Sequence, residues 1–173
     1  SCGEEIENSL TRANIKGNVK EIIETTFDAK EAFGEPQKGD LRTKRKLKYN
    51  GYGNVTESTS YNADGELDFN WKYQFDEDGN ITEGTYYDAE VELDGKYNYQ
   101  YDDDGNKTEI TSYNADGEIE SKYKHQYDDD GNWTGYTLYN ADGEIESNSK
   151  YQYEYDKLKN WIAKTEYIND ILE

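Results

Sequence analysis

Along most of the chain, apolar and polar residues alternate in short runs that are separated by turns rich in Asp and Gly. From residue 54 onward, shorter runs (54–62, 80–88, 106–114 and 132–140) alternate with longer ones (66–76, 92–102 and 118–128). Alternation with a period of two, in runs rich in Tyr, Ile and Thr, is typical of β-strands. The pattern therefore predicts a series of short antiparallel strands.

Three-residue loops join these runs, and most of them end in Asp-Gly, as in Ala63-Asp64-Gly65. A three-residue hairpin loop commonly ends in a residue with positive φ, which Gly adopts without steric strain. The Asp before the Gly can brace the turn through its side chain. We therefore expect structural turns with positive φ at Gly65, Gly79, Gly105, Gly117, Gly131 and Gly143.

The strand pattern repeats with a period of 26 residues. Tyr101-Asp-Asp-Asp-Gly-Asn recurs from Tyr127, and a close copy starts one period earlier at Phe75. Periods of about 20–50 residues mark stacked supersecondary units. We predict an all-β antiparallel meander of about 10–11 strands, built from these hairpin repeats, with at most short helical turns.

Divergent segments flank the regular repeats. The first contains an expected loop at 33–39, which holds the only Pro of the chain. The last contains a long strand whose two extra residues suggest a bulge. We expect a polar tether at 1–16 and then one β-repeat domain over 17–173. Within that domain the predicted parts are a capping unit at 17–50, regular repeats at 51–143 and a C-terminal unit at 144–173.

Pairing the strands across their turns predicts which side chains share a face. Uninterrupted pairing from the turn at 77–79 places Tyr73 beside Glu83 and Trp71 beside Thr85. All aromatic side chains then lie on one face, and Lys, Asn, Gln, Asp and Ser occupy a wet face. We expect the aromatic face to turn inward in a curled single sheet or a barrel-like sheet, because a flat sheet would expose a large apolar patch.

Charge limits the partners of this chain. It has 39 acidic and 19 basic residues and a formal net charge of -20. Such a charge disfavours binding to nucleic acid or to an anionic membrane surface. The basic residues cluster once, on one face of a predicted strand, at Arg42, Lys44, Lys46 and Lys48. We expect these to pair with acidic residues of neighbouring strands rather than with nucleic acid.

Cys2 is the only cysteine, so no internal disulfide can form. It lies in Ser-Cys-Gly and is followed by a polar segment that includes Glu4 and Glu5. This arrangement resembles what remains of a bacterial lipobox after its signal peptide has been removed. No apolar run approaches the roughly 20 residues that span a bilayer. We expect a lipid on Cys2 to be the only membrane attachment, and the alternative is an ordinary thiol at a frayed terminus.

The recurring Tyr-x-Tyr-Asp-x-x-Gly-Asn motif alternates with an Asn-Ala-Asp-Gly turn over residues 49–167. The combination resembles the Rhs, or YD-repeat, family of bacterial surface and secreted proteins. Members of that family use such repeats as β-hairpin scaffolding, often in large shells around toxin cargo. The resemblance implies a β-rich protein of the bacterial cell surface or envelope, and it implies no activity.

The acidic turns invite a calcium-binding interpretation. A calcium loop requires Asp at its first ligand position. In the turns at 102–105 and 128–131 that position is held by Gln100 and Gln126. Turn chemistry alone explains these Asp residues. We therefore predict neither a specific metal site nor a cofactor.

A row of carboxylates invites a catalytic interpretation. Uninterrupted pairing stacks Glu57, Glu83 and Glu109 on the aromatic face, with His125 close to the last of them. Paired carboxylates can hydrolyse glycosidic bonds. This row repeats with the scaffold, however, and Tyr hydroxyls could satisfy it as a structural ladder. We expect no enzymatic activity, and His125 is interpreted as a replacement for Tyr.

Three functions stay open at this point. The first is a non-catalytic cell-envelope lipoprotein that presents an acidic surface to a protein partner. The second is a module that binds a glycan or a small ligand on aromatic platforms, and the third is a hydrolase. Exposed aromatic side chains beside Asn and Asp would favour the second, buried Trp the first, and one cleft with paired carboxylates the third. The candidate platform residues are Trp71, Trp133, Trp161, Tyr99 and Tyr127.

Overall fold

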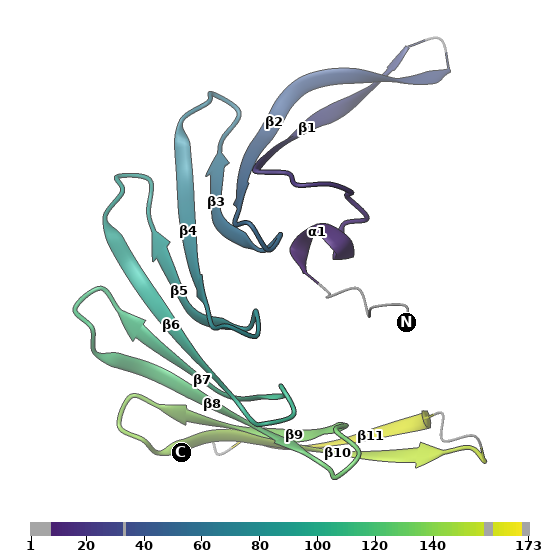
Figure 1. The fold of residues 1–173 in the computed structure, drawn as a ribbon, viewed down its shortest axis with the longest axis vertical. Coiled ribbons are helices and arrows are strands. Elements are labelled where there is room, and N and C mark those ends of the chain that lie inside the picture. The colour runs from purple at the N-terminus through teal and green to yellow at the C-terminus, as the bar shows by residue number, and fades with distance from the viewer. Residues whose placement is uncertain (1–7, 33, 158–160, 171–173) are drawn as a thin grey trace. The chain divides into compact units, whose positions relative to one another are not determined.

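The computed structural model describes residues 8–32, 34–157 and 161–170. It contains one short helix, α1 (Ser9–Arg12), and eleven strands whose hydrogen-bonded order follows the sequence. The strands are β1 (Glu21–Ala32), β2 (Glu35–Tyr49), β3 (Val55–Tyr61), β4 (Leu67–Phe75), β5 (Ile81–Tyr87), β6 (Leu93–Tyr101), β7 (Lys107–Asn114), β8 (Ile119–Tyr127), β9 (Trp133–Asn140), β10 (Ile145–Tyr155) and β11 (Trp161–Asp170). The predicted all-β antiparallel meander is confirmed (Figure 1). The strand order begins at β1 and ends at β11, so the sheet is open and not a barrel.

The chain divides into two compact units, residues 1–94 and 95–173. Unit 1 holds α1 and strands β1 to β5, and unit 2 holds nearly all of β6 and strands β7 to β11. The predicted N-terminal capping unit belongs to unit 1, and the divergent C-terminal unit belongs to unit 2.

The hairpin turns have the conformation that their glycines predict. The six glycines of the predicted turns have φ between 79° and 86°. In the turn after β6, the N–H of Gly105 donates to the carbonyl oxygen of Asp102 at 3.1 Å. The bracing side chain is the residue that opens the turn and not the Asp before the Gly, which corrects the expectation. Asp102 Oδ1 accepts hydrogen bonds from the backbone N–H groups of Asp104 and Asn106, because it lies within reach of both. The same pair of hydrogen bonds from two backbone N–H groups to one side-chain oxygen recurs at Asn62, Asp76, Asp88, Asp128 and Asn140.

The turn after β5 differs from the others, because Val91 stands where its copies have Gly. Val91 has a φ of 66°, and its N–H donates to the carbonyl oxygen of Asp88 at 3.2 Å. A β-branched residue in the left-handed region is strained. The side chain of Val91 is 63% exposed, so little packing compensates for this strain.

Each regular short strand begins with a β-bulge that the alternating pattern did not reveal. In β5, Ile81 pairs with Phe75 and Glu83 pairs with Gln74, which leaves Thr82 as an extra residue. The same shift occurs at the start of β3, β7 and β9. A one-residue shift in pairing moves the following side chains to the opposite face of the sheet.

These bulges overturn the predicted pairing. Tyr73 pairs with Gly84 and Trp71 pairs with Tyr86, one position beyond the partners that uninterrupted alternation predicts. A second bulge occurs early in the long strands, at Asp68 in β4, and the pairings of β8 and β10 shift at the equivalent place. The chain therefore changes face at the start of each of these strands.

As a result, large aromatic side chains lie on both faces, and the predicted division into an aromatic face and a wet face is wrong. In each unit we name the face that carries its central Trp, which is Trp71 in unit 1 and Trp133 in unit 2, the aromatic face. In unit 1 it also carries Phe69, Tyr73, Phe75 and Tyr86, and in unit 2 Tyr97, Tyr99, Tyr101, Tyr123, His125, Tyr127, Tyr136, Tyr151 and Tyr153. The opposite face is named the lysine face and carries Lys44, Lys46, Lys48, Lys72, Lys96, Lys122 and Lys124 with Tyr61, Tyr87, Tyr113 and Tyr139.

In each unit the sheet is a single layer with little core. Among the described residues, the buried hydrophobic side chains are Leu10, Leu47 and Tyr151. The most deeply buried side chains are small and polar, since Ser58 and Ser149 are each 1% exposed beneath larger neighbours. Such a sheet is held by its ladder of backbone hydrogen bonds and by cross-strand side-chain pairs worth about 0.2–1 kcal/mol each. The large aromatic side chains consequently stay half-exposed.

The N-terminal part of unit 1 folds against the turn between β2 and β3. The side chain of Asn8 caps α1 by accepting hydrogen bonds from the N–H groups of Leu10 and Thr11. Leu10 is buried, and its N–H donates to the carbonyl oxygen of Gly53 at 3.1 Å. Part of the expected tether at 1–16 is therefore packed on the turn between β2 and β3.

Strand β2 covers most of the segment that was expected to be a loop at 33–39. β2 begins at Glu35, and Pro36 pairs with Glu31 of β1. The Pro is tolerated because this part of β2 pairs with β1 alone, and the pairing with β3 begins only at Lys44. The expected loop is therefore too long: Gly34 lies in a turn with a φ of 80°, Phe33 lies outside the described residues, and residues 35–39 belong to a strand.

The long strand of the C-terminal unit is lengthened rather than given an additional bulge. β10 continues to Tyr155, which pairs with Trp161 at the start of β11. Its pairing with β9 shifts between Ile145 and Ser147, as in the other long strands. The two extra residues therefore extend the strand, which corrects the predicted bulge.

Candidate functional site

Trp133 lies at the centre of an aromatic cluster in unit 2. Its ring centroid is 4.7 Å from that of Tyr151 and 5.8 Å from that of His125. Lys164 Nζ lies 3.6 Å from the centroid of the Tyr151 ring, within the range of a cation–π interaction. Burial, followed by a hydrogen bond with Glu166, raises the pKa of Tyr151 to about 12. The cluster is therefore a rigid aromatic surface with one cation at its border.

Next to this cluster, Tyr99, Tyr127 and His125 surround Lys107. The Nζ atom of Lys107 lies 4.6 Å from the centroid of the Tyr99 ring. The Tyr127 hydroxyl donates to the carbonyl oxygen of Lys107 at 3.0 Å. Burial lowers the pKa of Lys107, and burial followed by the charge of Lys107 lowers the pKa of His125. Tyr127 also pairs with Trp133, so three predicted platform residues belong to one region of unit 2.

A polar depression of about 800 Å³ lies between two acidic turns of unit 2. It combines an aromatic ring with many hydrogen-bonding groups. Its lining includes Tyr127, His125, Thr108, Asn106, Asp104 and Asp129. Carboxylates accept hydrogen bonds, Asn, Thr and His can both donate and accept them, and the ring offers a flat apolar contact. This composition suits a ligand that has hydroxyl groups on its edges and an apolar face.

The turns hold some of these carboxylates in place. The side-chain amide of Asn106 donates to Asp102 and lowers the pKa of that carboxyl group. Asn132 does the same for Asp128, donating to both carboxylate oxygens at 3.1 and 3.0 Å. Both Asp side chains are therefore ionised at neutral pH, and the border of the depression is rigid and negative.

Trp71 forms an aromatic cluster in unit 1. Its ring stacks on that of Tyr73, with centroids 5.9 Å apart and an interplanar angle of 4°, and lies 5.1 Å from the ring of Tyr86. Gly84 lies against this stack, and a Cβ atom there would be in van der Waals contact with Trp71 at 3.4 Å and with Tyr73 at 3.5 Å. Trp71 and Trp133 are half-buried. The side chain of Trp161 lies outside the described residues, so its platform role stays a prediction.

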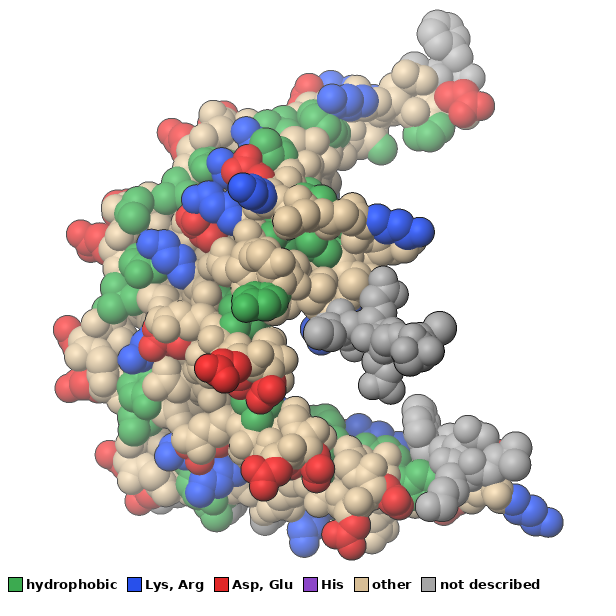
Figure 2. Space-filling model, viewed as in Figure 1, with side chains coloured by type: hydrophobic (Ala, Val, Ile, Leu, Met, Phe, Trp, Pro, Cys, Tyr) green, Lys and Arg blue, Asp and Glu red, His purple; other side chains and the backbone are tan. Residues whose placement is uncertain are grey.

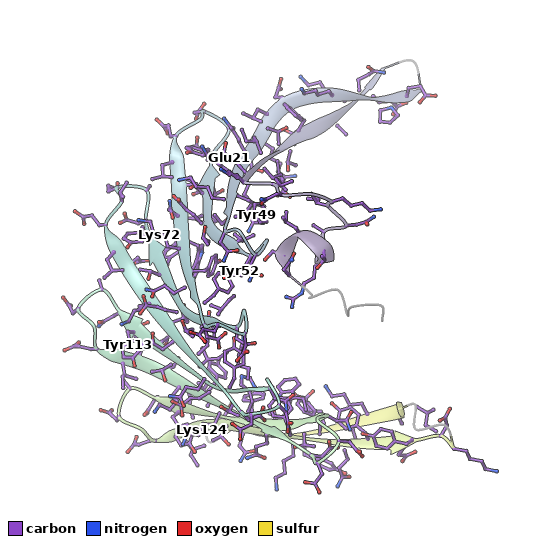
Figure 3. The ribbon with its side chains drawn as sticks, viewed as in Figure 1. Glu21, Tyr49, Tyr52, Lys72, Tyr113 and Lys124 are labelled. Carbon is purple, nitrogen blue, oxygen red and sulfur yellow. The ribbon has the colours of Figure 1, made fainter. Side chains whose placement is uncertain are left out.

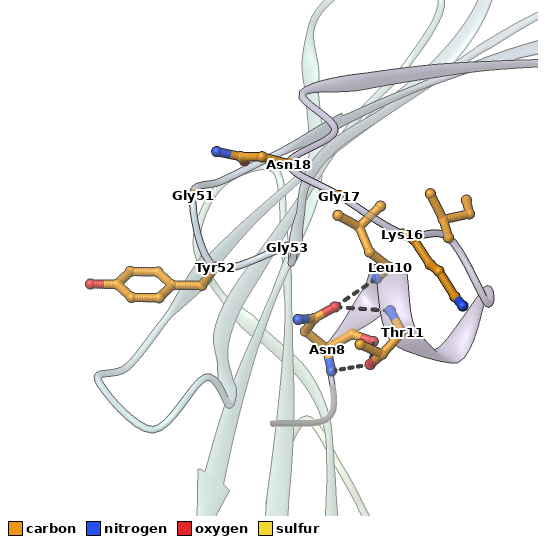
Figure 4. Close-up of a pocket in the computed structure, with 10 residues that line it drawn as sticks. Asn8, Leu10, Thr11, Lys16, Gly17, Asn18, Gly51, Tyr52 and Gly53 are labelled. Atoms are coloured by element: carbon orange, nitrogen blue, oxygen red, sulfur yellow. Dashed lines mark hydrogen bonds between the residues drawn. The ribbon is translucent and has the colours of Figure 1, made fainter. Parts of the chain in front are cut away.

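A second depression, of about 510 Å³, lies in unit 1 between α1 and the turn from residue 50 to 54 (Figure 4). The polar groups of Asn8 and Thr11 are used to cap the helix. Tyr52 points away from α1 and is 84% exposed. These polar groups satisfy one another, so this depression indicates no ligand chemistry.

The glutamate row lies on the lysine face, which corrects its expected place beside the aromatic residues. Glu57 accepts a hydrogen bond from Lys48 at 2.6 Å. Glu109 lies 3.2 Å from the Nζ atom of Lys122 and 4.0 Å from that of Lys124, which Figure 3 labels. Glu83 accepts a hydrogen bond from the side-chain amide of Gln74 at 2.7 Å. Lysines and an amide therefore satisfy these carboxylates in place of the expected Tyr hydroxyls, because the bulge turns each short strand over.

The basic strand β2 pairs with acidic neighbours, as predicted. Lys46 forms an ion pair with Glu21 of β1 at 2.8 Å. More generally, acidic and basic side chains lie close together over the visible surface (Figure 2). Lysines on this face also lie over tyrosine rings, with Nζ-to-centroid distances between 4.8 and 5.8 Å. The pairs are Lys44–Tyr61, Lys72–Tyr87, Lys96–Tyr113 and Lys124–Tyr139. The sequence analysis did not predict this row of lysine–tyrosine contacts. The Tyr that recurs at the end of every regular short strand was the feature that could have indicated it.

In the described ranges of the chain, no group of three or more His, Cys, Asp or Glu residues is arranged to hold a metal ion. The same ranges contain no helix that is long and apolar enough to cross a membrane. Cys2 lies outside the described residues, so its lipidation stays a prediction.

No protein-family model and no curated protein matches this chain. Among solved structures, a porin-like protein from Bacteroides uniformis is 13% identical, over 86% of this chain and 94% of that one, with a TM-score of 0.29. A DUF3836 family protein from Parabacteroides distasonis is 14% identical over 86% and 91%, with a TM-score of 0.14. The Photorhabdus luminescens Tc holotoxin pore is 13% identical over 67% of this chain and only 9% of its own, with a TM-score of 0.25. Identities and TM-scores this low assign neither a family nor a function.

Proposed function

We propose that this protein is a non-catalytic binding module of the bacterial cell envelope, attached through a lipid on Cys2, and that unit 2 binds a glycan in the depression beside Tyr127. The observation that carries the ligand class is the presence of Tyr127 among Asp, Asn, Thr and His side chains in one depression. Composition and charge placed a protein partner ahead of a glycan. Half-exposed aromatic rings beside Asn and Asp reverse that order.

The geometry suits a sugar because the ring of Tyr127 is held before any ligand arrives. Its hydroxyl group donates to the carbonyl oxygen of Lys107, and burial followed by the charge of Asp102 raises its pKa. The phenol therefore stays neutral and oriented, and its ring can stack against the C–H face of a pyranose. A ring that is ordered in advance loses little entropy on binding.

Binding without turnover fits the positions and pKa values of the carboxylates. A glycosidase needs one carboxyl group whose pKa is raised, so that it can act as a general acid. The pKa of Asp102 and that of Asp128 are both lowered by the Asn side chains in their turns. Glu109, the carboxylate of the predicted glutamate row in unit 2, is engaged by lysines on the opposite face.

The first experiment is an array of neutral and acidic oligosaccharides probed with the whole chain. The best binder is then titrated calorimetrically against Tyr127→Ala. We expect this variant to lose about tenfold or more in affinity, the equivalent of roughly 1.4 kcal/mol. Tyr153→Ala is the matched control, since its hydroxyl makes the same bond, to the carbonyl oxygen of Trp133 at 2.8 Å, away from the depression.

A basic protein partner is the second candidate, because the net charge of -20 favours long-range attraction to cations. An array of basic peptides tests it. Attraction of this kind weakens as salt rises, since the Debye length is about 8 Å at physiological ionic strength. Salt-sensitive peptide binding that Tyr127→Ala leaves unchanged would replace the glycan proposal. Release of reducing sugar from any array member would show turnover and overturn both.

A further inference from the structure

The last strand of unit 2 carries exposed apolar side chains at an open sheet edge. β11 pairs with β10 on one side and ends the strand order. Three large apolar side chains on this strand, Ile162, Tyr167 and Ile168, are 62%, 55% and 61% exposed. An open edge with exposed apolar residues is a template for another strand.

The sequence of β11 is self-complementary when two copies run antiparallel about Thr165. In that register each residue faces the one at the mirrored position. Lys164 then faces Glu166, Ala163 faces Tyr167, and each of these pairs occurs twice. Ile162, the extra residue of the bulge at the start of β11, precedes this regularly paired stretch. Thr165 faces Thr165 of the other copy. Opposite charges, apolar pairs and Thr–Thr pairs all stabilise antiparallel strands.

Neighbouring registers lose this match. Moving the centre of symmetry one residue toward the N-terminus places Lys164 opposite its own copy, and moving it one residue the other way does the same for Glu166. Like charges directly opposite each other are unfavourable. The charge pattern of β11 therefore favours the register centred on Thr165 over its two neighbours.

We infer that two copies of this chain associate through β11, antiparallel and with a two-fold axis at Thr165, so that their sheets join edge to edge. Such an interface uses the same surface on both copies and closes at two. Lys164 extends over the ring of Tyr151, on the aromatic face, and Glu166 pairs with Tyr151 across β10 and β11. The side chains of Lys164 and Glu166 therefore already lie on the same face of the sheet, which is the face on which they would pair with the second copy. β11 does not line the depression beside Tyr127, so dimerisation and glycan binding can fail independently.

Cysteine cross-linking tests the register directly, because Thr165 alone faces its own copy. Cys2→Ser removes the only native thiol. In that background Thr165→Cys should give a disulfide-linked dimer under mild oxidation. Directly opposed residues in antiparallel strands have Cα atoms about 4.5–5.5 Å apart, which a disulfide can span. Lys164→Cys and Glu166→Cys are the matched controls and should cross-link far less, since neither faces itself.

Charge reversal tests the same register in solution. Lys164→Glu and Glu166→Lys each place like charges opposite each other twice, and each should weaken the dimer about tenfold or more in sedimentation velocity. The double reversal should restore it. The runs use about 0.15 M salt, which screens the repulsion between the acidic copies. Lys150→Glu makes the same charge change one strand inward, at an exposed residue of β10 on the lysine face, and should have no effect.

A circular dichroism spectrum unchanged from that of the wild type shows that each variant is folded. A chain that stays monomeric at every concentration would overturn the inference. Equal cross-linking at positions 164 and 165 would also overturn it. Assemblies larger than two that persist in Lys164→Glu would overturn it as well, because they would indicate a head-to-tail contact between β11 and β1.

Discussion

Replacing Val91 by Gly should stabilise the protein, because Val91 is a β-branched residue held at positive φ. Its φ is 66°, in a turn whose copies place Gly at this position. Backbone conformations of this kind cost about 1–3 kcal/mol, and a β-branched residue lies toward the upper end of that range. Gly adopts the same conformation without a steric penalty.

Two smaller terms oppose this gain. Gly loses more conformational freedom on folding than other residues, which costs roughly 0.5–1 kcal/mol. The side chain of Val91 is 63% exposed, so removing it forfeits only about 0.5 kcal/mol of apolar burial. With about 2–3 kcal/mol of strain relieved, we expect a net gain of about 1 kcal/mol. For a chain of this length that corresponds to a rise in Tm of about 2–4 °C.

Thermal and urea unfolding of Val91→Gly measure this gain. Gly117→Val is the mirror variant, because Gly117 has a φ of 81° in the equivalent turn and a Cβ atom there would meet nothing within 4 Å. It should lose about as much stability as Val91→Gly gains. Val91→Ala removes the β-branch but keeps the positive φ, so its gain should be smaller. The reasoning is refuted if Val91→Gly is no more stable than the wild type, or if Val91→Ala gains as much.

Four further outcomes are expected. Gly105→Val should lose about 1 kcal/mol or more in chemical unfolding, whereas Gly51→Val, in a turn position without positive φ, should change little. Because the pKa of Tyr151 is raised to about 12, its contribution to stability is present below pH 10 and is lost as the pH rises toward 12, so Tyr151→Phe should flatten that part of the unfolding free-energy profile. Glu109→Gln should lose about 0.5–1 kcal/mol at low salt and less at high salt in urea titrations, since two lysines share this carboxylate. In bacteria that express the chain behind a lipoprotein signal peptide, Cys2→Ser should abolish incorporation of labelled fatty acid, and unchanged labelling would refute lipidation at Cys2.

The strands and turns of this protein follow from its local sequence. The turn after β6 forms because Gly105 adopts positive φ. It also forms because the side chain of Asp102 can accept hydrogen bonds from the backbone N–H groups two and four residues later in the chain. These interactions need no distant partner, so the period of 26 residues predicts the order and type of the elements. The ion pair of Lys46 with a neighbouring strand was predictable for a similar reason, since adjacent strands are joined by short turns.

The candidate site was predictable only in part. Tyr99, Tyr127 and Trp133 were identified by residue type, because aromatic side chains are natural platforms. Their arrangement around Lys107 and the depression beside His125 arise from pairings across several strands.

Only the tertiary structure decided which side chains share a face. Alternation within a strand is the same whether or not its neighbour contributes an extra residue, so the sequence of β5 does not mark Thr82 as the residue without a partner. That single shift moves Glu83 and Tyr87 away from Trp71 and onto the lysine face. A bulge depends on hydrogen bonds between two strands, which alternation in either strand does not contain.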